Sequence, residues 1–448
     1  MASDAAPSRG LGGTENGWWR AMPGGTGVSV LIFLPTRPIS RPLLESAVRS
    51  LQSTHPILRA FLSAPTPGQP TLTVGSAPSA TVRVLAASDV LPAEPGQVSS
   101  FHALLERELN LNAWAEQGPV DPILYATIYE GVPDEGRSAV ALRMHSSACD
   151  RASVGAVLKE LVQLLAGGEK GTKEEPFHAA LEDLIPKADT YKPFWARGKD
   201  MIGYGINGLR TSPLPFEDTV TERRSEVARL VLTRDETQKL LSECEERGVK
   251  LCGAIGAAAM MAARSSKQLE SHQYETYSLV TLIDCRKNLD PPLNGQNMGN
   301  FQSAVINTHN IQGAENFWEL VKRCHESYHT AVTNKKHLKD INDLNFLFLR
   351  AIDNPQLTPS ASQRTALVTV FEESAIHESS ELPKELGVED YIGCSSVHGI
   401  GPSLAVFDTI RDGKLDCAIV YPAPLHSRKQ IGELIDHIKR ILLGNEEE

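Results

Sequence analysis

The sequence SAVALRMHSSACDRAS, residues 138–153, joins two elements of different type. Its first half, which ends at His145, is an apolar run that predicts a strand. After Asp150, apolar residues recur at helical spacing along one face: Val154, Val157, Leu158, Leu161 and Leu165. A strand, a polar loop with a histidine and an aspartate, and a helix therefore follow one another. The loop is the first candidate site of the chain.

Strand and helix patterns alternate in both halves of the chain, which predicts the α/β class. GVSVLIFLP at 27–35 predicts a strand, and Ser40 is placed to cap a helix over about 41–53. Further on, Thr233 and Glu236 form a capping box, and Asp412-Gly413 predicts a hairpin turn between two apolar runs. The other predicted strands are 71–74, 81–85, 122–130, 227–232 and 277–284. The other predicted helices are 102–111, 234–248, 253–264, 317–332 and 427–444.

The length of the chain sets the expected number of domains. With 448 residues it exceeds one ordinary core, so we expect two lobes of roughly 200 residues each. The irregular stretch 186–226, with several Pro and Gly residues, is interpreted as the crossover between them. The predicted division is an N-terminal lobe at 1–185, this linker, and a C-terminal lobe at 227–448.

Composition excludes several classes of protein. The net charge of −11 argues against a general nucleic-acid or anionic-membrane surface. Seven cysteines without a C-x-x-C pair predict reduced thiols, with neither a disulfide framework nor a metal site. No apolar run approaches the ~20 residues that a membrane helix needs, and the N-terminus lacks an apolar signal region. We therefore expect a cytoplasmic protein that binds neither nucleic acid nor a membrane.

Four stretches in order carry a resemblance to known proteins. They are STHPILRA at 53–60, the candidate loop itself, IDCRKNLDPPL…MGNF at 283–301, and VHGIGPSLAVF at 397–407. As an ordered set they resemble the chloramphenicol-acetyltransferase-like superfamily, which contains CoA-dependent acyltransferases of the BAHD type and condensation domains. The resemblance implies two similar α/β lobes, each a mixed sheet with helices, that enclose a tunnel.

The candidate loop resembles a degenerate form of the superfamily motif H-H-x-x-x-D-G. In that motif the second histidine is the general base, a role that suits its near-neutral pKa. Alignment on Asp150 makes His145 the first histidine, puts Ser146 at the base position and Arg151 in place of the glycine. Alignment on His145 as the base would put Cys149 at the aspartate position. We prefer the first alignment, because Asp150 and Arg286 then form the structural ion pair between lobes that the resemblance implies.

The resemblance implies roles for the motif residues, each beside a plainer alternative. His145 is either the base, reaching the tunnel from one position early, or a buried structural histidine. Ser146 is a substrate-contacting hydroxyl, an acyl nucleophile or a loop residue. Arg151 faces solvent or an anionic substrate. Asn300 is an oxyanion donor or a turn residue, and His398 is a second acid–base or substrate-contacting group or a structural one.

The function implied is transfer of an acyl group from a CoA thioester to an alcohol or amine. Acyl-CoA would be the co-substrate, favoured over a carrier-protein thioester, with no tightly bound cofactor, and the chain would act as a monomer. Because a serine hydroxyl cannot serve as a general base at neutral pH, two alternatives stay open. One is an impaired member that binds a small molecule or a protein; the other is a lyase or hydrolase on the same fold.

Overall fold

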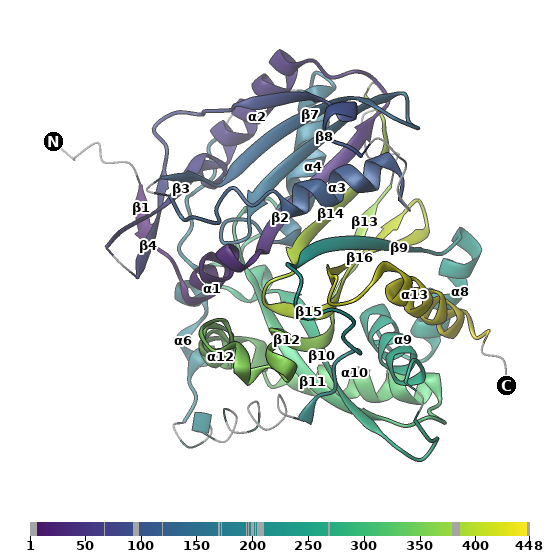
Figure 1. Cartoon of the computed structure of the whole chain (residues 1–448). Helices are drawn as coiled ribbons and strands as arrows, with labels where there is room; N and C mark the ends of the chain where they lie inside the picture. The colour runs from purple at the N-terminus through teal and green to yellow at the C-terminus, as the bar shows by residue number, and fades with distance from the viewer. Residues whose placement is uncertain are drawn as a thin grey trace. The chain divides into compact units, whose positions relative to one another are not determined.

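The computed structural model describes residues 7–66, 68–92, 98–118, 120–168, 171, 173–193, 195, 197–198, 201, 203, 210–267, 269–378 and 386–445. The chain divides into two compact units, drawn together in Figure 1. Unit 1 is Met1–Leu184 with Arg286–Phe301 and Glu378–Ser396. Unit 2 is Ile185–Cys285 with Gln302–His377 and Val397–Glu448. Each unit therefore contains segments that are far apart in the sequence.

Unit 1 is built on a five-stranded mixed sheet of order β14-β2-β8-β7-β5. Its strands are β2 (Thr26–Pro35), β5 (Val82–Ala86), β7 (Leu124–Val132), β8 (Arg137–His145) and β14 (Val388–Val397). All ten residues of β2 are buried, which suits a strand with neighbours on both edges. β2 runs antiparallel to β8 with Val28 opposite His145, so the sheet fixes the point where the candidate loop begins.

Helices and a second sheet complete unit 1. Its helices are α1 (Gly13–Ala21), α2 (Arg41–Thr54), α3 (Ser100–Asn110), α4 (Arg151–Leu165) and α5 (Leu181–Leu184). A small four-stranded sheet contains β1 (Ser8–Gly10), β4 (Gln69–Val74), β3 (Ala60–Thr66) and β6 (Asp121–Pro122). Apolar residues of α2 and α4, such as Leu51 and Leu161, share one core with Phe33 of β2. Burial of these apolar side chains holds α4, and with it the candidate loop, against the sheet.

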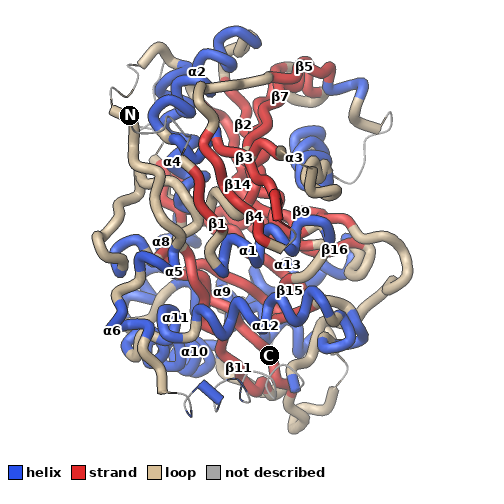
Figure 2. Tube along the Cα trace, turned by 90° about the vertical axis from the view of Figure 1, so that its left-hand side faces the viewer, coloured by secondary structure: helices blue, strands red, loops and turns tan. Residues whose placement is uncertain are grey.

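Unit 2 is built on a seven-stranded mixed sheet. Its strands are β9 (Arg224–Val231), β10 (Glu275–Asp284), β11 (Gln302–Ile311), β12 (Arg364–Phe371), β13 (Ala375–His377), β15 (Gly401–Arg411) and β16 (Lys414–Ala423). Its helices are α6 (Lys187–Thr190), α8 (Arg234–Glu246), α9 (Leu251–Ser265), α10 (Phe317–Thr333), α11 (Lys336–Lys339), α12 (Ile341–Asp353) and α13 (Arg428–Leu443). Figure 2 distinguishes these helices and strands by colour. Because α9 is rich in Ala and Gly, it is buried from Cys252 to Arg264 between α10, α13 and the sheet.

The α/β class with two lobes is confirmed, and so are the hairpin and both predicted caps. Asp412 and Gly413 have φ values of 49° and 74°, as the turn between β15 and β16 requires. Ser40 accepts a hydrogen bond from the backbone N–H of Leu43. The predicted division into contiguous lobes differs from the structure, because Arg286–Phe301 and Glu378–Ser396 pack within unit 1. The tunnel stays a prediction.

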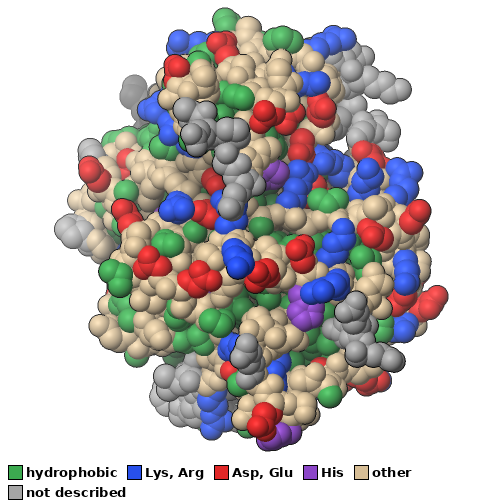
Figure 3. Space-filling model, turned by 45° about the vertical axis from the view of Figure 1, so that its right-hand side comes forward, with side chains coloured by type: hydrophobic (Ala, Val, Ile, Leu, Met, Phe, Trp, Pro, Cys, Tyr) green, Lys and Arg blue, Asp and Glu red, His purple; other side chains and the backbone are tan. Residues whose placement is uncertain are grey.

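Two further sequence-based expectations concern thiols and membranes. The side chains of all seven cysteines are buried, and their reduced state stays a prediction. Among the described residues, none of the helices combines the length and the apolar character of a transmembrane segment. On the face drawn in Figure 3, acidic and basic side chains are interspersed.

The capping box at the start of α8 gives a first test. Thr233 Oγ1 accepts from the N–H of Glu236 at 3.3 Å, and the Glu236 carboxylate accepts from the N–H of Thr233 at 2.7 Å. We expect Thr233→Ala to lower the free energy of unfolding of unit 2 by about 1 kcal/mol, measured by urea denaturation. Thr233→Ser keeps the acceptor and should unfold like the parent. Equal stability of the Ala and Ser variants would contradict the capping interaction.

Candidate functional site

The candidate loop, Ser146–Asp150, is held by backbone hydrogen bonds at both ends. At its start, the N–H of His145 donates to Ile123 O and the N–H of Ser146 donates to Gly27 O, both at 3.0 Å. A tight turn follows, in which the N–H of Ala148 donates to His145 O at 2.9 Å. At its end, Asp150 is the N-cap of α4. The loop therefore has a fixed course between strand and helix.

The carboxylate of Asp150 receives hydrogen bonds from four directions. Oδ1 accepts from the Ser153 N–H at 2.9 Å and from Nη2 of Arg286 at 3.0 Å. Oδ2 accepts from Nη1 of Arg286 at 2.9 Å and from the Phe301 N–H at 2.8 Å. The two charged side chains are 1–2% exposed. The pair is thus bidentate, buried and fully hydrogen-bonded, which is the geometry that compensates for loss of hydration.

The segment Arg286–Phe301 is fastened to the same loop. Arg286 Nε donates to Asn297 O at 3.0 Å, and the N–H of Asp150 donates to Gly299 O at 3.1 Å. A Cβ on Gly299 would lie 2.4 Å from Cε2 of Phe301, whose ring packs against the Arg286 guanidinium at 5.0 Å. A larger residue at 299 would therefore displace the ring that covers the ion pair.

The predicted ion pair is present, but it does not join the two lobes. Arg286 lies in a segment that packs within unit 1, so both partners belong to the same unit. The error arose from assigning Arg286 to a contiguous second lobe by its place in the sequence. The pair consequently stabilises the interior of unit 1.

The imidazole of His145 is completely buried. Its Nδ1 accepts the N–H of Ser147 at 3.1 Å, so in the neutral ring the proton is on Nε2. Nε2 is buried without a hydrogen-bond partner, and the ring meets the ring of Trp114 edge-on at 5.3 Å. Burial lowers the pKa of His145 to about 3. The geometry matches the structural alternative for His145, and it does not match a base that reaches a substrate.

Ser146 points away from that ring and joins a row of hydroxyl groups. Its Oγ lies 2.8 Å from Oγ of Ser29 on β2, which lies 2.8 Å from Oγ of Ser395 on β14. Ser29 has one proton to share between two neighbours, so the row can present either a donor or an acceptor at Ser146. We name these three residues the serine row. Ser146 is 5% exposed and Ser29 3%, whereas Ser395 is half-buried.

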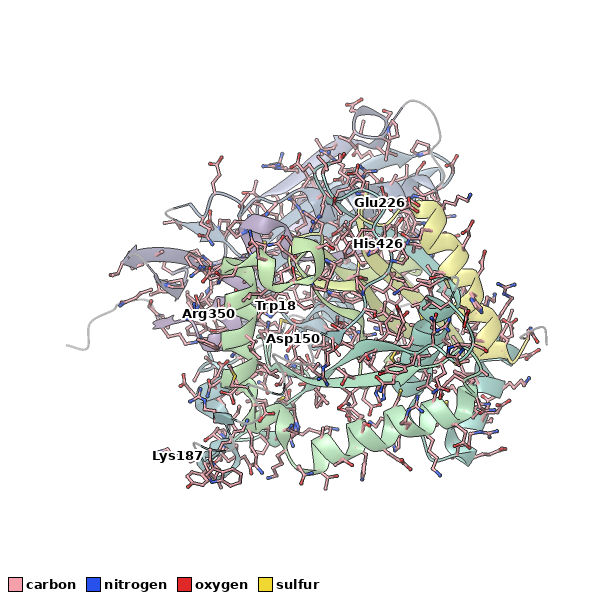
Figure 4. The ribbon with its side chains drawn as sticks, turned by 60° about the horizontal axis from the view of Figure 1, so that its bottom comes forward. Trp18, Asp150, Lys187, Glu226, Arg350 and His426 are labelled. Atoms are coloured by element: carbon pink, nitrogen blue, oxygen red, sulfur yellow. The ribbon has the colours of Figure 1, made fainter. Side chains whose placement is uncertain are left out.

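Small residues make room beside the serine row. Gly27 has φ 99°, and a Cβ there would lie 3.5 Å from Cβ of Ser146 and 3.2 Å from Cε3 of Trp18. Figure 4 labels Trp18 and Asp150 among the side chains of this region. A residue other than glycine at 27 would be strained in this backbone conformation and would crowd Ser146.

The remaining predicted residues divide between the two units. Asn300 is close to the loop, where its Nδ2 donates to Ser146 O at 2.7 Å. That bond makes Asn300 a tether of the loop, and a role as oxyanion donor stays a prediction. Arg151 is the first residue of α4 and half-buried. His398 belongs to unit 2, where its Nδ1 lies 3.0 Å from Ser225 Oγ.

Sequence reasoning missed Ser29, Ser395 and Trp114, since single residues on separate strands leave no spacing pattern. Metal binding has no support among the described ranges, where no cluster of at least three His, Cys, Asp or Glu side chains could hold an ion. The site is thus an arrangement of hydroxyls and amides around one buried ion pair.

Comparisons with known proteins bear on this arrangement. Residues 221–412 match the family model described as phthiocerol/phthiodiolone dimycocerosyl transferase C-terminus. No curated protein matches the chain in sequence. Solved structures match it along its length, although their sequence identities are low.

Three solved structures show the range of similar proteins. The trichothecene 15-O-acetyltransferase TRI3 from Fusarium sporotrichioides has a TM-score of 0.73 at 12% identity, covering 100% of this chain and 96% of its own. Polyketide synthase associated protein 5 from Mycobacterium tuberculosis has a TM-score of 0.66 at 14% identity, and the match covers 97% of this chain and 99% of that protein. The X-domain from teicoplanin biosynthesis, solved in complex with OxyB, has a TM-score of 0.61 at 18% identity, and the match covers 99% of this chain and 94% of that domain.

Removal of one partner of the buried pair is the second test. Arg286→Met keeps the apolar stem but leaves Asp150 charged and buried, so we expect unit 1 to lose about 3–5 kcal/mol in urea denaturation. Asp150→Asn can still cap α4, so the double variant leaves no lone charge and should be at least as stable as Arg286→Met. The matched control is Arg41→Met, whose partner Glu45 is on the surface, and it should change little. A double variant less stable than Arg286→Met would contradict this account.

The burial of His145 predicts a pH dependence. Its folded pKa of about 3 lies below the ordinary value of 6.5, so the unfolded chain takes up the proton first as the pH falls. The contribution of neutral His145 to the free energy of unfolding is therefore fully present above about pH 6.5. It declines toward pH 3, by up to about 1.4 kcal/mol per pH unit. His145→Asn can keep an acceptor for the Ser147 N–H and should reduce the slope between pH 6 and 4.

Urea denaturation at several pH values measures that slope. The control is His272→Asn, because the His272 side chain is 76% exposed. Slopes that agree among the parent and both variants would show that His145 titrates freely in the folded protein.

Proposed function

Since the chain has the fold of the chloramphenicol-acetyltransferase-like superfamily, we propose that it transfers an acyl group from a thioester to an amine. The matching family model and the similar structures include acyltransferases, which supports acyltransferase-like function. The thioester donor and the amine acceptor are our own inference from the candidate loop. We propose acyl-CoA as the first donor to test.

The observation that carries the proposal is the anchoring of the loop by Asp150 and Arg286. Bidentate pairing and the N-cap of α4 keep residues 146–150 in one conformation. A loop held in this way can position reactants, and positioning contributes strongly to reactions between two substrates. The anchoring supports a working site even though the motif has lost its second histidine.

The acceptor class follows from the groups that the loop offers. His145 is sealed from solvent, and Ser146 cannot take a proton at neutral pH. An alcohol oxygen is a weak nucleophile that needs a base to remove its proton as it attacks, whereas an unprotonated amine nitrogen can attack first and lose its proton afterwards. The amine nitrogen would attack the thioester carbonyl, the C–S bond would break, and the thiolate would leave with the proton from nitrogen. The site therefore fits an amine better than an alcohol.

Ser146 and Arg151 have proposed roles in this reaction. The serine row can turn the hydroxyl proton of Ser146 outward, where it would donate to the carbonyl oxygen as negative charge develops. Arg151, at the start of α4, would face an anionic group of a substrate. His145 and Asn300 would hold the loop without contacting the reactants.

Our expectation about which molecule carries the acyl group needs a correction. We expected acyl-CoA in preference to a carrier protein, but similar structures include a polyketide synthase associated protein and a domain from teicoplanin biosynthesis. Those relations argue against excluding a carrier protein. A thioester on a carrier is therefore a second donor form, with the same chemistry at the carbonyl carbon.

A binding function is the second candidate. It is favoured by the sealed imidazole of His145, and one domain of this fold was solved in complex with a protein, OxyB. In that case the anchored loop would shape a recognition surface, and no thioester would be consumed. The two functions differ in whether a covalent product forms.

A single-turnover assay separates the two functions. With acyl-CoA and carrier-bound donors, we expect amide products from amines and no ester from alcohols, detected by mass spectrometry. Ser146→His places an imidazole at the motif position and should raise transfer to alcohols by about 10²-fold or more. Ser146→Ala should slow amide formation, and His145→Asn serves as the control outside the reaction. Absence of any acyl product from the folded parent and from Ser146→His would exclude the transferase.

A further inference from the structure

One edge of the unit 2 sheet, which is formed by the ends of neighbouring strands, brings together arginine and histidine side chains from distant parts of the sequence. Ser225 on β9 pairs with Pro422 of β16, and Arg364 at the start of β12 pairs with Gly401 of β15. The strands β12, β15, β16 and β9 are consecutive in the sheet. These residues therefore lie at the same end of neighbouring strands. The side chains concerned are Arg223, Ser225, Arg364, His398 and His426, and Figure 4 labels His426 just before α13.

Two guanidinium groups meet at this edge. Arg223 Nη1 and Arg364 Nε both donate to the backbone oxygen of Ser362, so the two positive charges share one acceptor. Arg364 is 3% exposed and gives its other bonds to the backbone oxygens of Val397, Gly399 and Pro402. Among the described residues, neither arginine has a carboxylate partner, although buried arginines ordinarily have one.

The neighbouring acid on β9 does not compensate for these charges. Glu226 follows Ser225 directly, so its side chain points to the opposite face of the strand. It is bound there by Arg224, Arg428 and the hydroxyl of Tyr421. Burial is the main cause that lowers the pKa of His398 and His426 to about 4, and the positive charges of Arg364 and Arg223 lower it further. Burial, and after it the like charge of Arg223, lowers the pKa of Arg364 to about 9.

The imidazoles keep hydrogen-bonding capacity beside the arginines. Ser225 Oγ accepts the Val397 N–H at 2.9 Å and lies 3.0 Å from Nδ1 of His398. With the hydroxyl as donor to Nδ1, the proton of the neutral His398 ring is on Nε2 and free to donate. Nδ1 of His426 is 3.2 Å from Pro215 O, and its ring is buried beside the side chain of Gln430. Half-buried Arg223 has further N–H groups beyond its single bond.

We propose that this edge binds an oxyanion, the phosphate or carboxylate group of a small molecule, through Arg223 and His398. Arg223 would donate from its remaining N–H groups, His398 would donate from Nε2, and Arg364 would supply a fixed positive charge behind them. The bound anion would neutralise the two guanidiniums that share the Ser362 oxygen. The inference concerns unit 2 alone and does not depend on acyl transfer.

Thermal unfolding and calorimetric titration with inorganic phosphate and with acetate, against chloride at equal ionic strength, test the site. We expect at least one of the two oxyanions to raise the melting temperature, and the stronger effect identifies the phosphate or carboxylate class. Arg223→Ala should weaken that affinity by about tenfold or more, and Arg223→Lys by less, since lysine keeps the charge but loses the planar fork. Arg224→Ala is the matched control, because Arg224 is the next residue and has its own carboxylate partner in Glu226.

A second readout separates binding from a purely structural role. In chloride alone, Arg223→Ala removes one of two like charges and should melt at or above the temperature of the parent. A lower melting temperature in chloride, together with an unchanged response to phosphate and acetate, would assign Arg223 a structural role and overturn the proposal. So would a parent that responds to neither oxyanion, or equal responses of the Arg223→Ala and Arg224→Ala variants.

Discussion

The bidentate pair of Asp150 and Arg286 is the interaction on which the rest of unit 1 depends. One carboxylate ends the candidate loop, caps α4 and receives the N–H of Phe301, while the guanidinium fixes Asn297. Burying two charges is costly unless every donor and acceptor finds a partner. The backbone amides of Ser153 and Phe301 supply partners here. The pair therefore connects the candidate loop, the first turn of α4 and the segment Arg286–Phe301.

The loop also shows how a single shift along a strand changes chemistry. His145 and Ser146 are neighbours at the end of β8, and successive side chains of a strand point to opposite faces. The imidazole accordingly packs on Trp114, and the hydroxyl joins Ser29 and Ser395. The histidine that remains in the sequence is therefore on the face away from the serine row. The imidazole of His145 is therefore next to the motif position in the sequence, but it cannot exchange a proton with a group bound beside Ser146.

Local pattern predicted much of the fold, because apolar periodicity and capping residues act over a few positions. β2, α2, α4 and the hairpin at Asp412-Gly413 were found in this way. β14 was missed, because Asp390, Gly393 and two serines are uncommon in strands and its partner β2 is about 360 residues away. The serine row and the cluster around Arg364 were missed for a related reason. Their members are single residues on separate strands, and only tertiary structure brings them together.

The discontinuity of unit 1 has a consequence for its biosynthesis. β14 is the sheet neighbour of β2, but it is translated only after most of unit 2 has been made. Until then β2, whose residues are all buried in the finished protein, has one open edge, and open apolar edges attract other chains. The sheet of unit 1 therefore cannot be completed during synthesis until β14 has been translated. Slow translation of the segment between these two strands would lengthen the time for which that edge is exposed.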